Sequence, residues 1–324
     1  MEFGIEILPN VPCYEIEYYA KLAEDYGFGY VWITDHYNNR NALVVLTSIA
    51  RVTNSLRIGT GITNPYHMNP AVIASAIATI NEISGGRAVL GIGAGDKFTL
   101  RQIGIKQSKP LTRVREAVEI IRKLVAGELV RYEGKVFDFD GARMNFKAKV
   151  FPIYIGAQGP KMLKLASEIG DGVIINASHP KDVKFAMKNL NIREGFDVAV
   201  CSAFSVDKDR EVAINTVKPV VAFIVASSPK EILERHGIAE ESVKYVRNAL
   251  NEAFAKGKWK ELSNAVTDEM VDAFSIAGTP DEVVERIKML RDLGVTQMVI
   301  GSPIGKDKAK AIRTIGKLVI PHFR

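Results

Sequence analysis

The stretch Phe3-Gly4-Ile5-Glu6-Ile7-Leu8 opens the chain with a short apolar run that one carboxylate interrupts. Apolar residues then recur between residues 16 and 23 with the 3.6-residue period of an amphipathic helix, and Gly27 is placed to end that helix. The next apolar run is Tyr30–Ile33. Residues 3–33 therefore predict a strand, a crossover helix and a second strand parallel to the first.

The same alternation continues along the chain. The short runs are rich in Val and Ile and are often apolar on both faces, which is typical of parallel strands covered by helices. The predicted strands are Phe3–Leu8, Tyr30–Ile33, Arg57–Ile62, Ala88–Ile92, Ile153–Ala157, Val173–Ile175, Val198–Ala203 and Met298–Ile300. The clearest helix start between such runs is Thr279-Pro280-Asp281-Glu282, which supplies an N-cap, a proline at N1 and a glutamate at N3.

Eight strand–helix units in 324 residues predict an α/β fold of the (β/α)₈ barrel type. The alternative is a pair of doubly wound domains, but no Pro/Ser-rich stretch offers a linker between them. We therefore expect residues 1–324 to form one barrel domain.

Three stretches are too long for simple connections and are expected to be insertions. They are 96–109 after the fourth strand, 129–150, and 227–275 after the seventh strand. Apolar and polar residues alternate on both sides of Gly134, which predicts a hairpin in the second insertion. The third insertion has a helical pattern.

Composition limits the classes of function. Hydrophobic residues make up 47% of the chain and charged residues 25%, as in soluble globular proteins, which excludes disorder as the main state. The net charge of +6 is spread along the chain, which favours a small anionic ligand over nucleic acid. No apolar run is long enough to cross a bilayer, no export signal opens the chain, and no His or Cys pair has metal-ligand spacing. We expect a cytoplasmic protein without a metal.

Polar, glycine or turn-forming residues follow six of the predicted strands. In a (β/α)₈ barrel the loops after the carboxyl ends of the strands build the site. The residues of any one loop are explained by an ordinary turn. Six such loops at the carboxyl-end rim of the barrel together predict a pocket. The loops are Thr34–Tyr37, Thr63–His67, Gly93–Lys97, Gln158–Pro160, Asn176–Pro180 and Gly301–Pro303.

Glu6 is the first candidate catalytic residue. It shares a strand face with Gly4 and Leu8, and a central strand has no solvated face, so we expect its carboxyl to be largely desolvated. Burial raises a carboxyl pKa and suits the group to proton donation near neutral pH. The alternative is a structural ion pair with an Arg or Lys inside the barrel.

Asp35 and His36 directly follow the second strand. A carboxylate and an imidazole at this position suit acid–base chemistry or a hydrogen bond to a ligand ring. The alternative is an N-cap for the helix near Asn41.

Asp96 and Lys97 follow the glycine-rich run Gly91–Gly95. The run is superficially similar to a dinucleotide fingerprint, but an aspartate stands where helix packing needs Gly or Ala, so we reject that interpretation. We expect the spaced glycines to let a flat ring system approach the backbone.

Two further strand ends are candidates for anion binding. The stretch Gly156-Ala157-Gln158-Gly159-Pro160 ends a strand and opens a helix, whose free amides suit a phosphate. Asn176, Ala177 and Ser178 offer further donors after the next strand. Ordinary helix caps are the alternative for both.

Taken together, these residues resemble the luciferase-like (β/α)₈ barrels that bind flavins or deazaflavins. Within that family they are most similar to the coenzyme F420-dependent methylenetetrahydromethanopterin reductases of methanogenic archaea. The resemblance covers essentially the whole chain, although Ala94 stands where proline is expected and 129–150 matches no stretch familiar from the family. It rests on residues 3–6, 32–39, 61–66, 91–97, 155–160, 234–237 and 301–305.

The resemblance implies that reduced coenzyme F420, a dissociable co-substrate, passes a hydride from its ring C5 to the methylene carbon of methylenetetrahydromethanopterin. It implies a non-prolyl cis peptide at Gly61–Ile62 behind the coenzyme ring, Glu6 as the general acid, and Asp35 and Asp96 as orienting or proton-relay residues. His36 and Lys97 are expected to bind the substrate, and a homodimer or homotetramer is expected. The residues expected to bind the coenzyme are Gly61, Ile62, Thr63, Asn64, Gly156, Ala157, Gln158, Asn176, Ala177 and Ser178.

Other functions on the same fold stay open. One is an FMN-dependent monooxygenase; another is an F420-dependent alcohol or sugar-phosphate dehydrogenase, in which His36 would serve as the base. A non-catalytic flavin-binding barrel is a third, although such a protein has little need of Glu6.

Overall fold

The computed structural model describes residues 1–324, and the chain divides into two compact units. The N-terminal unit comprises Glu2–Ile175 and Ala186–Ala199. The C-terminal unit comprises Met1, Asn176–Phe185 and Val200–Arg324. Whether the chain is one domain, as the sequence predicts, stays a prediction.

The strands of the N-terminal unit form a parallel sheet in the order β1-β2-β3-β4-β7-β8. Most of their residues are buried, as expected for strands covered on both faces. Each matches a predicted run to within about two residues at either end. Their bounds are β1 Glu2–Ile7, β2 Tyr30–Ile33, β3 Arg57–Thr60, β4 Ala88–Ile92, β7 Ile153–Gly156 and β8 Gly172–Asn176.

Helices connect these strands, and their starts follow local capping chemistry. The Asn41 side chain caps its helix by accepting hydrogen bonds from the backbone of Leu43 and Val44, and Asn69 caps the next helix. Helices α3 and α5 pack against each other. The bounds are α1 Cys13–Asp25, α2 Ala42–Val52, α3 Pro70–Ile83, α4 Lys97–Gln102, α5 Pro110–Val125 and α6 Pro160–Ile169.

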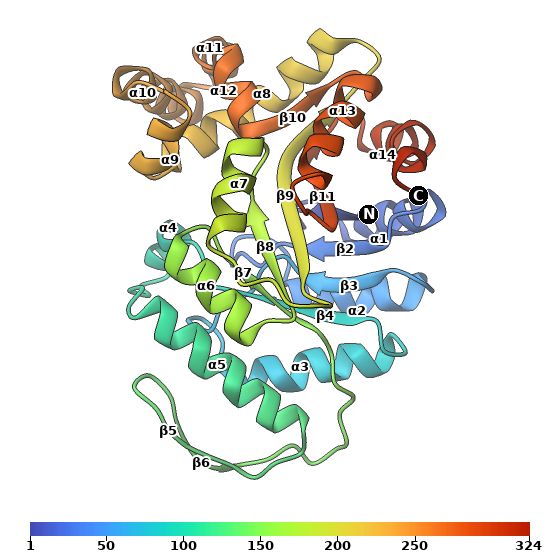
Figure 1. Ribbon diagram of the computed structural model, residues 1–324, viewed down its shortest axis with the longest axis vertical. Helices are drawn as coiled ribbons and strands as arrows, with labels where there is room; N and C mark the ends of the chain where they lie inside the picture. The colour runs from blue at the N-terminus through green and yellow to red at the C-terminus, as the bar shows by residue number, and fades with distance from the viewer. The chain divides into compact units, whose positions relative to one another are not determined.

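The predicted hairpin in the insertion 129–150 is confirmed. Strands β5 (Val130–Glu133) and β6 (Asp138–Ala142) pair antiparallel on either side of Gly134. Figure 1 shows the hairpin as a loop beyond α5, at the lower edge of the view. The buried Glu116 of α5 accepts hydrogen bonds from the backbone at the hairpin tip, so the insertion is tied to the helix that precedes it.

The C-terminal unit contains β9 (Asp197–Val206), β10 (Ser275–Gly278) and β11 (Gln297–Ile304), in the order β10-β9-β11. The sequence did not predict β10, because this short run follows directly on a helix. The predicted capping box is confirmed, with Thr279 as N-cap and Glu282 at N3.

The insertion 227–275 is helical, as predicted, and its helices form a core of their own with α8, which lies with them at the top of Figure 1. The helices and the terminal 3₁₀ turn of this part of the chain are α7 Pro180–Lys188, α8 Arg210–Ser227, α9 Lys230–Arg235, α10 Glu240–Lys256, α11 Trp259–Ala265, α12 Asp268–Phe274, α13 Pro280–Arg291, α14 Lys308–Leu318 and η1 Ile320–Phe323.

Candidate active site

Glu6 lies in β1, opposite Trp32 of β2. Its neighbours Ile5 and Ile7 are 0% and 2% exposed, whereas Glu6 is half-buried. Phe3, Gly4 and Ile5 are all buried, so burial alone does not test the predicted alternation of faces, and Glu6 is less buried than predicted.

Asp35 is held by two donors from the loop that follows the neighbouring strand. Thr63 Oγ1 donates to Asp35 Oδ2 over 2.6 Å, and His67 Nε2 lies 3.2 Å from the same oxygen. Burial of the carboxyl opposes its ionisation, but these hydrogen bonds and the nearby imidazoles outweigh burial and lower the pKa of Asp35. The ionised form of Asp35 is thus favoured, and it accepts hydrogen bonds from Thr63 and His67. It does not cap the helix that begins after it, because Asn41 does so.

His67 was not predicted as a site residue. It belongs to the loop after β3, next to the loop that carries Asp35, and loops after neighbouring parallel strands lie side by side. This proximity of neighbouring loops was the one signal in the sequence that could have indicated the contact between Asp35 and His67.

A pocket of about 210 Å³ opens beside Asp35. His36, Asn64 and His67 line it from the strand ends, and Leu100 lines it from α4. The structure thus brings three of the predicted site residues together, namely Asp35, His36 and Asn64. Asn64 also organises its own loop, because its buried side chain accepts hydrogen bonds from the backbone of Tyr66 and His67.

The peptide bond Gly61–Ile62 is cis, which confirms that prediction. The Ile62 side chain occupies the space beside two glycines, since a Cβ at Gly93 would lie 2.4 Å from Ile62 Cδ1 and a Cβ at Gly156 would lie 2.1 Å from it. A Cβ at Gly91 would meet the Thr60 carbonyl oxygen at 2.0 Å. These glycines are therefore needed because a Cβ at any of the three positions would overlap protein atoms. The expectation that the spaced glycines admit a flat ring stays a prediction.

Asp96 is the N-cap of α4, where its Oδ1 accepts a hydrogen bond from Thr99 N over 2.7 Å. Asp96 and Lys97 are both exposed, and neither lines the pocket beside Asp35. The contact seen for Asp96 is therefore a cap.

The end of β7 offers fewer free amides than its sequence suggests. Ala157 N donates to Ile174 O over 3.0 Å, so this amide is already used. Gly159 is the N-cap of α6, and a Cβ there would meet nothing within 4 Å, so the backbone at Gly159 is open. Gln158 beside it is exposed.

Asn176, Ala177 and Ser178 belong to the C-terminal unit. Ala177 N donates to Cys201 O over 3.1 Å, and the buried hydroxyls of Ser178 and Ser202 are hydrogen-bonded at 2.7 Å. Asn176 is exposed. The loop after β8 is therefore fixed by β9, with Asn176 at the surface.

No group of three or more His, Cys, Asp or Glu side chains is placed to hold a metal ion. No helix has both the length and the apolar character needed to cross a membrane.

Residues 1–297 match the family model described as luciferase-like monooxygenase. The chain belongs to the luciferase-like family. It is 59% identical to a 5,10-methylenetetrahydromethanopterin reductase of Archaeoglobus fulgidus over 100% of both chains. It is 51% identical to the enzyme of the same name from Methanolobus tindarius, over 99% of this chain and 100% of the relative.

This luciferase-like chain also superposes on a solved structure of the coenzyme F420-dependent tetrahydromethanopterin reductase from Methanopyrus kandleri. The TM-score is 0.92 at 44% identity, and the match covers 100% of this chain and 99% of that one. The predicted (β/α)₈ barrel fold is therefore confirmed.

Proposed function

We propose that this protein is a coenzyme F420-dependent reductase that converts 5,10-methylenetetrahydromethanopterin to 5-methyltetrahydromethanopterin. The observation that carries the proposal is the match in fold and sequence, over essentially the whole chain, to an F420-dependent tetrahydromethanopterin reductase. The near-full-length relatives at 59% and 51% identity are reductases of the same name. The dehydrogenase and monooxygenase alternatives are not favoured by these matches.

The residues present fit a polar ring coenzyme such as F420. Thr34, next to Asp35, is 7% exposed, and its hydroxyl has no partner in the protein. A buried hydroxyl without a partner is costly, so a ligand hydrogen bond at this position would be stabilising. The open backbone at Gly159 gives a second point of approach for a ligand.

The coenzyme, when bound, supplies the hydride. The residues proposed to hold it lie at the ends of β3, β7 and β8. They are Gly61, Ile62, Thr63, Asn64, Gly156, Ala157, Gln158, Asn176, Ala177 and Ser178. Of these, Asn64, Gln158 and Asn176 carry amide side chains, which both donate and accept hydrogen bonds.

Glu6 is the proposed proton donor. Reduction of the methylene bridge breaks a carbon–nitrogen bond, and the departing nitrogen needs a proton. Glu6 lies on strand β1 and is half-buried, and partial burial favours the protonated form that a general acid needs. General acid catalysis of this kind contributes about 10²–10⁴-fold to the rate.

Asp35 has a different proposed role. As a carboxylate held by Thr63 and His67, it is suited to orient a donor group of the bound ligands. His36 lines the same pocket and is proposed to contact the substrate. Asp96 and Lys97, exposed at the start of α4, are proposed to meet more distant parts of the substrate.

A homodimer or homotetramer in the cytoplasm is proposed as the working form. Exposed apolar side chains on α2 and α3, such as Val44 (66%) and Val72 (54%), give such an assembly surface to bury.

The test is coenzyme selection. Purified protein is mixed with methylenetetrahydromethanopterin and, separately, with reduced F420, reduced FMN or NADPH, and the oxidation of each coenzyme is followed by absorbance. We expect substrate-dependent oxidation of reduced F420 alone. Turnover only with reduced FMN or NADPH, or oxidation of F420 that does not depend on the pterin, would refute the proposal.

A further inference from the structure

Three stacked side chains of the N-terminal unit connect the tip of the β5–β6 hairpin to the loop after β3. The guanidinium carbon of Arg113, near the start of α5, lies 5.0 Å from the ring centre of Phe137 at the hairpin tip. The same carbon lies 4.6 Å from the ring centre of Tyr66 in the loop after β3. One cation thus joins aromatic rings from two segments that are far apart in sequence.

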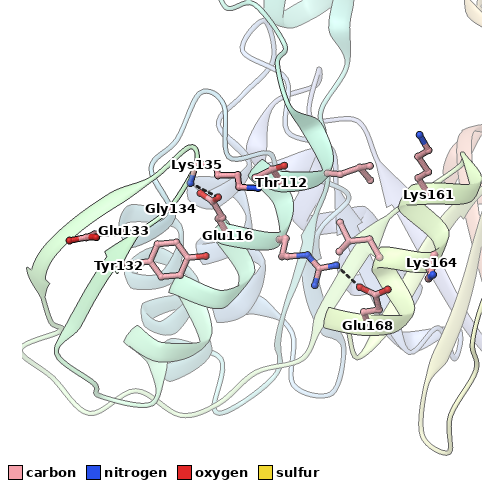
Figure 2. A pocket seen from close by; sticks show the side chains of 12 residues that line it. Thr112, Glu116, Tyr132, Glu133, Gly134, Lys135, Lys161, Lys164 and Glu168 are labelled. Atoms are coloured by element: carbon pink, nitrogen blue, oxygen red, sulfur yellow. Dashed lines mark hydrogen bonds and ion pairs between the residues drawn. The ribbon is translucent and has the colours of Figure 1, made fainter.

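The hairpin end of this stack is fixed by α5 itself. The buried Glu116 lies one helical turn after Arg113, on the same face of α5. It accepts a hydrogen bond from Phe137 N over 3.0 Å and one from Lys135 N over 2.8 Å, the second of which is drawn in the view of the pocket beside the hairpin (Figure 2). Because a carboxylate holds the tip through charge-assisted hydrogen bonds, the Phe137 ring is kept against Arg113.

The other end of the stack holds the loop Thr63–His67. Arg113 Nη1 donates to Pro65 O over 3.3 Å, and the Tyr66 hydroxyl donates to Ser108 O over 2.6 Å, just before α5. Arg113 Nε is buried and has no hydrogen-bond partner. An unpaired buried donor is costly, which indicates that the two rings, and not hydrogen bonds alone, set the place of the guanidinium.

This loop carries both groups that hold the Asp35 carboxylate, but the stack acts mainly on one of them. Thr63 Oγ1 donates to Asp35 Oδ2 over 2.6 Å, and His67 Nε2 lies 3.2 Å from the same oxygen. Thr63 is fixed independently, because its backbone amide donates to Gly91 O over 2.9 Å. His67 directly follows Tyr66, so a displaced Tyr66 backbone moves His67 away from Asp35.

We propose that Arg113 is a positioning residue for the candidate active site. Through the loop after β3 it holds His67 against Asp35, and the ring of Phe137 holds Arg113 in place. The inference rests on the proposed function and deepens it, because Asp35 is the carboxylate proposed to orient the bound ligands. The hairpin insertion thus influences the reaction through the start of α5.

The first readout needs no coenzyme. It is the imidazole signal of His67 in a proton–nitrogen correlation NMR spectrum of the free protein, assigned by its loss in His67→Gln. We expect Arg113→Leu and Phe137→Leu both to shift this signal, because each removes one layer of the stack.

The matched control is Arg193→Leu. Arg193 also packs on an aromatic ring, with its guanidinium carbon 5.2 Å from the ring centre of Phe196, and it also donates to backbone carbonyls, those of Ser167 and Gly170. These carbonyls lie before β8, at the opposite end of the strands from the site loops. The control should leave the His67 signal in place.

The second readout is kcat/KM for the oxidation of reduced F420 with methylenetetrahydromethanopterin. We expect Arg113→Leu to lower kcat/KM by about 10-fold, because a displaced carboxylate orients its partners poorly. In a protein that already carries His67→Gln, adding Arg113→Leu should cause no further loss, since both changes remove the same contact.

If Arg113→Leu does not fold, Phe137→Leu, at a half-buried residue of the hairpin tip, carries both measurements. An unchanged His67 signal, or a loss of kcat/KM that adds in full to that of His67→Gln, would overturn the inference and leave the proposed function intact. If the unmodified protein does not oxidise reduced F420 with the pterin, the proposed function fails, and the His67 signal alone then decides whether Arg113 holds this loop.

Discussion

The position of the Ile62 side chain explains why residues 93 and 156 are both glycine. Its Cδ1 lies where the Cβ of any larger residue at position 93 or 156 would have to be. The glycines at these positions are therefore needed for packing between β3, β4 and β7. The sequence around these glycines does not show this contact, so their role in packing could not be predicted from the sequence.

Gly156→Ala should lower the free energy of unfolding by about 1–3 kcal/mol, because the added methyl overpacks against Ile62. Ile62→Val removes Cδ1 and leaves Cγ1, 3.4 Å from the new methyl, as the nearest atom of that side chain. The double variant should recover most of the loss seen with Gly156→Ala. Urea unfolding of the four proteins in this cycle measures the coupling, and strictly additive effects would show that the two residues do not compete for space.

The Asp35 carboxylate should stabilise the fold in a pH-dependent way. Its pKa is lower in the folded protein than in the unfolded chain, so its contribution is present at neutral pH and is lost as the pH falls through the folded pKa, below 3.8. Asp35→Asn should lower the free energy of unfolding by about 1.5–3 kcal/mol at pH 7, which is the usual contribution of hydrogen bonds to a charged group.

Urea unfolding at pH 7, 5 and 3.5 checks this. The difference between the native protein and Asp35→Asn should be smaller at pH 3.5 than at pH 5. A difference that stays constant between pH 5 and pH 3.5 would show that Asp35 does not hold a lowered pKa.

At the level of elements, the hairpin depends on one buried carboxylate. Glu116 satisfies three backbone amides at the tip, and no other acidic side chain contacts those amides. Glu116→Gln keeps the size of the side chain but replaces one acceptor oxygen with a donor, which faces an amide N–H.

We expect Glu116→Gln to lower stability by about 2 kcal/mol and to make residues 134–137 a preferred site of proteolysis. Limited proteolysis with mass spectrometry measures the second effect. The matched control is Glu119→Gln on the same helix, since Glu119 accepts from the Tyr132 hydroxyl and not from the tip. Equal protection of the tip in both variants would contradict the role given to Glu116.

Elements were predictable where a periodic pattern and a cap coincide. Residues 279–282 carry a complete capping box in sequence, and α13 begins there. Strands β2 and β4 were predicted to the residue because both are uninterrupted apolar runs. Strand β10 was missed because Ser275–Gly278 has neither length nor β-branched enrichment and follows a helix without a turn signal.

At the level of the whole molecule, the repeated strand–helix pattern of the sequence was enough to predict the fold. The same sequence predicted only part of the candidate site. Parallel strands place their carboxyl ends together, so Asp35, His36 and Asn64 were expected near one another, and they line one pocket. The pairing of Asp35 with His67 and the cap made by Asp96 depend on loop conformation, which composition and spacing do not specify.

The central claim is that Glu6 delivers the proton in an F420-dependent reduction, and Glu6→Gln tests it most directly. Glutamine keeps the shape of the side chain and cannot serve as the acid. The measurement is kcat for oxidation of reduced F420 with methylenetetrahydromethanopterin, alongside the calorimetric affinity for F420. We expect kcat to fall by about 10²-fold or more with the affinity unchanged. A variant that retains full turnover would contradict the claim.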